Sequence, residues 1–207
     1  MKIEYCHSTA TGSRRINLTA IDLPIATLQQ YYHEPQVRDA CRTGCMNFNK
    51  KWCCPPVAKN FEMLAEGYSY AIIICLHINL TDFECIKSKY QRIRAANSVL
   101  KSQSNRISRK IELECGGLAL LNGSCCLCKP CAKKLDLLCR KPEQMRYSLE
   151  ATGINVCNLL EETIGFQLQW YSREFMPQYT AVASGILHNL KHLYDRNSLY
   201  SLVKMQT

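Results

Sequence analysis

The sequence predicts an α/β fold of the mixed α+β kind, a single compact domain with a small central sheet flanked by helices. Residues 68–78 are apolar almost throughout, which is typical of a central strand covered on both faces. Between residues 86 and 118, apolar side chains recur at helical spacing. Neither a low-complexity linker nor a repeat divides the 207 residues, so we expect one domain over residues 1–207.

The first predicted elements precede the apolar strand. Ile16, Leu18 and Ala20 alternate with polar residues, which indicates a short strand. After Pro55-Pro56, an apolar stripe over residues 57–65 indicates a helix, because proline is tolerated in a first helical turn.

Two helices are expected after the apolar strand. The first covers residues 86–100 and the second covers residues 107–118, each with its apolar side chains on one face. The second helix is expected to end near Asn122-Gly123, directly before a cysteine-rich loop.

Two short helices follow that loop. Proline opens the first, over residues 142–151, and Gly153 closes it. The second covers residues 156–164 and is closed by Gly165.

Residues 166–207 are predicted to form a C-terminal hairpin and a helical tail. A strand over residues 168–172 would turn at residues 176–178 and return as residues 179–187. A helix over residues 190–194 would complete the chain's regular structure.

The chain holds fourteen cysteines, an excess that indicates disulfides, metal or redox chemistry. Residues 1–17 contain no apolar run and so do not read as a secretory signal, and the longest apolar run, residues 70–76, is far short of a membrane span. A chain of this length also buries a core without disulfides. We therefore expect a cytoplasmic protein without membrane attachment, whose cysteines serve as thiolates for metal.

One set of cysteines stands as C-x2-C-x2-C-x7-C and is followed by Pro142. Its members are Cys125, Cys128, Cys131 and Cys139. Two-residue gaps let successive thiolates turn inward around one centre, and ferredoxin-type loops open with the same run. Cys126 could replace Cys125, but only Cys125 keeps the two-residue gap to Cys128.

A second set lies upstream, with Cys41 and Cys45 followed by the pair Cys53-Cys54. Gly44 allows a tight turn and Pro55-Pro56 fixes the chain after the last cysteine. Cys54 is preferred over Cys53 because it adjoins the prolines. The fourth ligand stays open: Cys53, Cys75 or Cys85 could complete the site, or both sets could converge on one larger centre.

The spacing favours iron-sulfur over zinc. Structural zinc commonly takes two separated C-x2-C pairs, whereas three thiolates in one short loop fit the iron corners of a [4Fe-4S] cluster. No histidine occurs in either set. We expect one or two [4Fe-4S] clusters, with zinc as the alternative.

The two sets are expected to differ in role. Four thiolates hold a fully ligated cluster that passes electrons, whereas three leave one iron open to a small molecule. No familiar catalytic motif occurs, so catalytic residues stay unknown; redox catalysis at an open iron is the enzymatic version of the hypothesis. Glu150 is a candidate acid or base, although a surface carboxylate that orders Arg140 or Arg146 is the preferred interpretation.

The chain resembles the family of predicted metal-binding proteins known as domain of unknown function 2284. The resemblance covers about residues 35–165, in the same order. It is carried by these segments: Val37-Arg38, Trp52, Cys54-Pro55-Pro56, the downstream cysteine run with Arg140-Lys141-Pro142, and Ser148-Leu149-Glu150-Ala151-x-Gly153-Ile154-x-Val156. Asn155 stands where the family tends to have Asp. The family pattern falls on Cys41, Cys45, Cys54, Cys125, Cys128, Cys131 and Cys139, and implies metal binding, of iron-sulfur type.

The remaining cysteines have other interpretations. Cys75 lies in an apolar run and is expected to be a buried small side chain. Cys115 and Cys157 fall on apolar positions of helices, so core packing is expected for both. Cys6 and Cys85 have no partner at metal-ligand spacing.

The net charge is +9, and residues 82–112 carry eight Lys or Arg against three acids. Such patches are typical of nucleic-acid binding, but no known nucleic-acid motif or aromatic interleaving accompanies them, and a solvated helix face is the preferred interpretation. Cations also crowd the downstream cysteines. They raise the potential of a negative cluster and attract acidic redox partners such as a ferredoxin or flavodoxin.

We therefore predict an iron-sulfur protein that transfers electrons or serves as a redox accessory to a client enzyme. The alternative is a structural zinc protein, a nucleic-acid or protein interaction module.

Overall fold

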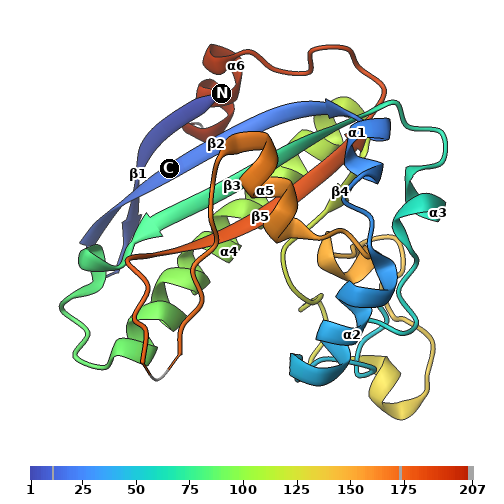
Figure 1. The fold of residues 1–207 in the computed structure, drawn as a ribbon, viewed down its shortest axis with the longest axis horizontal. Coiled ribbons are helices and arrows are strands. Elements are labelled where there is room, and N and C mark those ends of the chain that lie inside the picture. The colour runs from blue at the N-terminus through green and yellow to red at the C-terminus, as the bar shows by residue number, and fades with distance from the viewer. Residues whose placement is uncertain (11, 173, 205–207) are drawn as a thin grey trace.

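A five-stranded antiparallel sheet forms the centre of the computed structural model, which describes residues 1–10, 12–172 and 174–204. The strand order is β1-β2-β3-β5-β4, as Figure 1 shows. The strands are β1 (Lys2–Thr9), β2 (Gly12–Pro24), β3 (Tyr70–Asn79), β4 (Leu118–Leu120) and β5 (Tyr179–His188). The described residues also form six α-helices, so the fold is mixed α+β, which confirms the predicted fold class.

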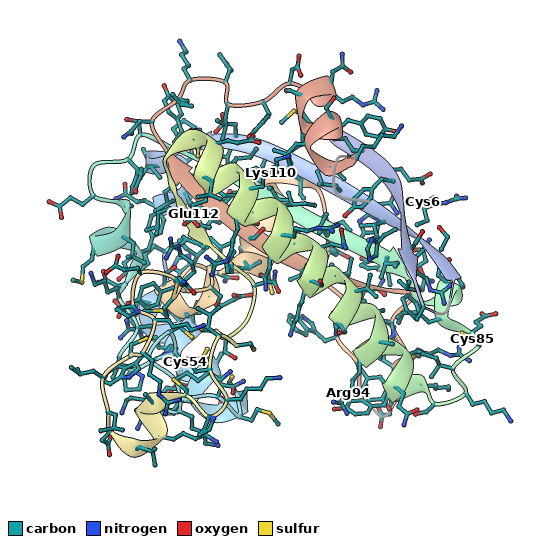
Figure 2. The ribbon with its side chains drawn as sticks, turned by 180° about the vertical axis from the view of Figure 1, so that it is seen from behind. Cys6, Cys54, Cys85, Arg94, Lys110 and Glu112 are labelled. Atoms are coloured by element: carbon teal, nitrogen blue, oxygen red, sulfur yellow. The ribbon has the colours of Figure 1, made fainter. Side chains whose placement is uncertain are left out.

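Helices α4 (Lys89–Cys115) and α6 (Arg196–Lys204) cover one face of the sheet. Seen from behind, α4 crosses the sheet diagonally (Figure 2). Leu18 on β2 and Ile74 on β3 pack here against Leu100 and Ile107 of α4, and all four are fully buried. Because side chains on a strand alternate between faces, Ile16, Leu18 and Ala20 all point to this core, as their pattern predicted.

The opposite face is covered by α1 (Ile25–Gln29), α3 (Phe61–Ala65) and α5 (Val156–Ile164). Ile73 and Cys75 of β3 pack against Leu28, Phe61 and Leu159. The central strand is therefore covered on both faces, as its apolar run predicted, and Cys75 is a buried core side chain.

The two helices predicted between residues 86 and 118 are one helix, α4. It is capped by Ser88 and ends at Gly116, whose φ of 63° is left-handed. Ser104, between the two predicted helices, and Ser108, at the start of the second, are buried and bond the hydroxyl of Ser184 on β5 at 3.2 and 2.8 Å. A buried polar contact therefore replaces the apolar stripe at mid-helix. Leu118, which was predicted to lie in the second helix, belongs to β4.

The helix predicted after Pro55-Pro56 is shorter than expected. It begins at Phe61, where Asn60 accepts a hydrogen bond from the Met63 amide, so asparagine and not proline opens it. Residues 142–149 form no helix, and only a 3-10 helix, η3 (Glu150–Thr152), lies in this segment. Helix α5 and its closing glycine, Gly165 with φ 66°, are confirmed as predicted.

The predicted C-terminal hairpin is wrong. β5 pairs with β3 over its whole length and with β4 on the other side, and residues 166–172 form no strand. The tail helix also starts later than predicted. Asp195 accepts a hydrogen bond from the Ser198 amide at 2.7 Å, so α6 begins after residues 190–194.

Several elements were not predicted at all, namely β1, β4, α1, α2 (Glu34–Gly44) and the 3-10 helices η1 (Leu80–Phe83) and η2 (Ala132–Leu135). Helix α2 and η2 lie together beyond one end of the sheet, in the lower right of Figure 1. We refer to this part, residues 34–60 and 121–148, as the cysteine lobe. Within the described ranges, no helix is both long enough and apolar enough to span a membrane.

Candidate metal centre

Two segments distant in sequence are bound together in the cysteine lobe. The Lys51 ammonium donates to the hydroxyl of Ser124 at 2.9 Å and to the carbonyl of Cys125 at 2.8 Å. The Trp52 indole N–H donates to the Leu137 carbonyl at 3.0 Å. Residues 51 and 52 thus hold the downstream cysteine loop on both of its sides.

All four downstream cysteines, Cys125, Cys128, Cys131 and Cys139, line one small cavity. Cys53, Trp52 and Met145 line it as well, with Arg140 and Lys141 at its edge. The cavity measures about 20 Å³. Leu127, Lys129 and Pro130, between these cysteines, are exposed, so the loop can rearrange without disturbing the sheet.

The three upstream cysteines, Cys41, Cys45 and Cys54, line a second and larger cavity of about 270 Å³. Cys41 lies in the last turns of α2, and Cys45 follows as the residue that ends the helix. Cys53 also lines this cavity, so its side chain stands on the wall between the two. The two cysteine sets are therefore neighbours, but each has its own cavity.

The thiols are not held in a ligating arrangement. No group of three or more His, Cys, Asp or Glu side chains in the described ranges is placed to hold a metal ion. All fourteen cysteines lie in those ranges and are free thiols, so none is withdrawn into a disulfide. The donor set fits a soft thiophilic metal centre, and binding would have to draw the sulfurs of each cavity inward.

The alternative fourth ligands of the upstream set are not all nearby. Cys75 is buried in β3, and Cys85 is exposed on the side of the molecule opposite Cys54 (Figure 2). That leaves Cys53 as the additional thiol in the upstream cavity. The sequence named Cys53 as one of three candidates for this fourth ligand, but it could not show that Cys53 also lines the downstream cavity, because that position depends on contacts with the downstream loop.

Cys53 takes part in a chain of sulfur contacts. Its Sγ accepts a hydrogen bond from the Cys125 amide at 3.0 Å and lies 3.8 Å from the Sγ of Cys54. The Cys125 thiol lowers the pKa of Cys53, but the contact with Cys54 and burial outweigh this and raise that pKa to about 11. The Cys53 thiol in turn lowers the pKa of Cys54.

Cys126 is directed elsewhere than its neighbour. It is exposed, its Sγ lies 3.3 Å from the Ser124 carbonyl, and it lines neither cysteine cavity.

Glu150 lines the upstream cavity together with Ser148 and Lys101. Its Oε2 atom is buried and has no hydrogen-bond partner among the described residues. Burial raises the pKa of this carboxyl. The preferred interpretation of Glu150 as a surface carboxylate that orders Arg140 or Arg146 is wrong: in the described residues it pairs with neither arginine, and Arg146 bonds Glu112 at 2.5 Å.

The motif residues around the cysteines have structural tasks. Arg38, on α2, donates to the Ala58 carbonyl at 2.9 Å and so holds the segment that follows Cys54. Gly153 has a φ of 100°, and a Cβ there would lie 2.8 Å from the ring of Tyr32. Its carbonyl accepts from the His33 amide at 2.9 Å, so only glycine lets this turn meet the start of α2.

Three other cysteines lie outside the cysteine lobe. Cys115 is half-buried and packs against the core, as expected. The prediction for Cys157 is wrong, because it lies on the exposed side of α5. Cys6 is exposed on β1, far from the lobe (Figure 2).

Comparison with known proteins identifies one family. Residues 25–187 match the family described as predicted metal-binding protein (DUF2284). No curated protein and no solved structure matches the chain. Since the match covers most of the sequence, the chain belongs to this predicted metal-binding family.

Proposed function

We propose that the protein binds iron-sulfur clusters and transfers electrons, either alone or as an accessory to a client enzyme. The observation that carries the proposal is that the four cysteines of one short loop line a single cavity, with no disulfide among them. When bound, a [4Fe-4S] cluster would supply one-electron chemistry. Cys125, Cys128, Cys131 and Cys139 would hold it, and Trp52 would shield it from water on one side.

The upstream cavity supports a second centre held by Cys41, Cys45 and Cys54. Its 270 Å³ leave room beside the thiols for a small molecule, as an open coordination position would need. Cys53 is the competing fourth ligand. Because Cys53 lines both cavities, centres bound in the two would be neighbours, which supports electron transfer between them.

The surface beside the downstream cavity supports an acidic redox partner such as a ferredoxin or flavodoxin. Three leucines close together in sequence, Leu135, Leu137 and Leu138, are 60%, 55% and 85% exposed. A group of exposed apolar side chains is typical of an interaction site, whereas a single one is not. Cations flank them at Lys133, Lys134, Arg140 and Lys141. An apolar centre with a basic rim suits a partner with an acidic rim. The fourteen free thiols suit a reducing compartment, and we propose the cytoplasm.

Structural zinc is the second candidate. The downstream cavity of about 20 Å³ is closer in size to a single ion than to a cluster, and four thiolates satisfy zinc. In that case the protein would be an interaction module without redox chemistry.

Anaerobic purification with metal and sulfide analysis separates the two candidates. A brown protein bleached by dithionite, with about four irons and four sulfides per occupied site, supports the proposal. Colourless protein with stoichiometric zinc and no sulfide overturns it.

Variants then assign the centres. Cys128→Ala should remove the downstream centre, whereas Cys85→Ala, at an exposed thiol outside the lobe, should keep the full iron content. Cys53→Ala tests the upstream set. Unchanged iron with an altered paramagnetic resonance spectrum would place Cys53 beside a centre without ligating it, and loss of iron would make it the fourth ligand.

A further inference from the structure

A third cavity opens next to the two cysteine cavities, and its lining is basic. It measures about 320 Å³, enough for a small metabolite. α4 contributes Lys101, Asn105 and Arg109, and the downstream segment contributes Asn122 and Arg146. No acidic side chain lines it in the described part of the chain.

The charges around this cavity do not cancel. Glu112, which does not line the cavity, is 93% buried at its side chain and pairs with Arg146 at 2.5 Å and with Arg109 at 3.9 Å. One carboxylate thus faces two guanidinium groups, and its Oε1 is also engaged by the Ala119 amide at 2.7 Å. The two arginines therefore leave one positive charge uncompensated.

Lys101 adds a second positive charge. Within the described ranges, its ammonium makes no ion pair and no hydrogen bond, although it interacts electrostatically with the buried carboxyl of Glu150. A side-chain carbon built on Gly123 would lie 3.6 Å from the Lys101 Nζ, so this ammonium stays close to the wall of the cavity. It is the cation best placed to meet a ligand.

Asparagine side chains supply neutral hydrogen-bonding groups. The Asn122 amide nitrogen donates to the Asn105 Oδ1 at 3.2 Å, while the Asn122 Oδ1 is buried with no partner in the described ranges. Turning both amides over preserves the bond between them and presents a donor instead. Asn122 thus has spare capacity for a ligand atom.

We propose that this cavity is a binding site for a small molecule that carries a phosphate or carboxylate group. Guanidinium and ammonium groups are the side chains that recognise such oxyanions, and a surplus of two positive charges in a partly enclosed space attracts them. The proposal does not depend on a metal, because every group in it belongs to the chain.

The position of the cavity beside the upstream cysteine cavity suits a substrate anchor. Lys101, Gly123 and Ser124 line both this cavity and the upstream cysteine cavity, so a molecule anchored by its oxyanion would extend toward Cys41, Cys45 and Cys54. This use as a substrate anchor rests on the proposed function. Oxyanion binding itself does not.

Calorimetric titration of the full-length, anaerobically purified protein tests the site. The probes are sodium phosphate for the phosphate class and sodium malate for the carboxylate class, with glycerol as a neutral control. We expect one of the two anions to bind, more tightly at low salt, and glycerol not to bind. Whichever anion binds more tightly identifies the class.

Two variants on the same helix form a matched pair. Lys101→Gln should weaken anion binding by about ten- to a hundredfold, because it removes a charge-assisted hydrogen bond. Lys110→Gln makes the same charge change outside the cavity, where Lys110 pairs with Glu114, and should bind like the parent protein. Equal affinity in both variants, or no binding of either anion by the folded parent, overturns the site.

The anchoring role has a separate readout. Malate or phosphate should shift the paramagnetic resonance spectrum of the loaded protein. An anion that binds without shifting it leaves the oxyanion site standing and refutes only its use beside the upstream centre. Absence of iron refutes the proposed function, and the calorimetric result is then judged alone.

Discussion

The sheet with its covering helices and the cysteine lobe are held together by different interactions. Ile72 and Ile74 of β3 are fully buried, and strand pairing continues along the whole of β2, β3 and β5. In the lobe, α2 has no buried residue, and Met46 and Leu138 are 80% and 85% exposed. The sheet is stabilised by apolar burial, whereas single polar contacts, such as those of Lys51 and Trp52, join the segments of the lobe.

Loss of the proposed downstream centre should separate the two regions most strongly. Cys128→Ser is expected to abolish that centre and to release the amides of residues 125–139 to hydrogen exchange, because metal binding supplies the order of such loops. β3 and β5 should keep their protection. Exchange measured by mass spectrometry, with Cys85→Ser as control, checks this. If the amides of the lobe stay protected from exchange after the metal is lost, the lobe does not depend on metal for its order, and the contrast with the sheet fails.

A substitution in the core of the sheet should lower stability without changing the metal content. Leu100→Ala in α4 empties a fully buried position and should lower the free energy of unfolding by about 2–5 kcal/mol. The metal content of the chains that remain folded should not change. Urea titration followed by circular dichroism, with metal analysis of the folded fraction, measures both. Metal loss in proportion to stability would show that the lobe and the sheet are one unit.

Glu112 joins the two regions, so its replacement should affect both. Glu112→Gln weakens the bonds to Arg146 and to the Ala119 amide, at 2.5 and 2.7 Å, and should cost about 1.5–3 kcal/mol of unfolding free energy. Glu114→Gln is the control on the same helix: Glu114 lies 3.9 Å from Lys110 at a more exposed position, and a glutamine oxygen can still accept the 2.5 Å hydrogen bond that the Tyr194 hydroxyl donates to Glu114. Equal effects of the two substitutions would contradict a joining role for Glu112.

The smallest expected effect is local to the lobe. Trp52→Phe removes the indole donor to the Leu137 carbonyl and should cost about 1 kcal/mol, felt as faster exchange in residues 133–138. The global unfolding midpoint should stay nearly constant. A large fall in that midpoint would mean that the loop and the sheet unfold together.

The sequence predicted best where local signals were sufficient. Helix α5 was predicted with its bounds because Gly165 marks its end and apolar residues repeat along it. β3 was recognised from its apolar run. The continuity of α4 was missed because it depends on Ser104 and Ser108 meeting Ser184, a contact between residues about 80 positions apart.

For the strands and the site as well, the sequence predicted local features but not contacts between distant residues. β5 was given the wrong partner, because periodicity indicates a strand but not its neighbour. Spacing grouped the cysteines into two sets, and the structure gives each set its own cavity. Spacing could not place Cys53 on the wall between the two cavities. That position follows from the hydrogen bonds that Lys51 and Trp52 donate to a loop more than 70 residues away.

The strand order has a consequence for biosynthesis. β5 is inserted between β3 and β4, so the sheet cannot close until residue 188 has left the ribosome. Cys139 emerges 49 residues earlier (188 − 139), which at ordinary translation rates is roughly 2–10 s. During that interval the nascent thiols have no finished scaffold beside them. Metal is therefore expected to bind after translation. Under oxidising conditions, the thiols of newly made chains should be oxidised before those of mature chains.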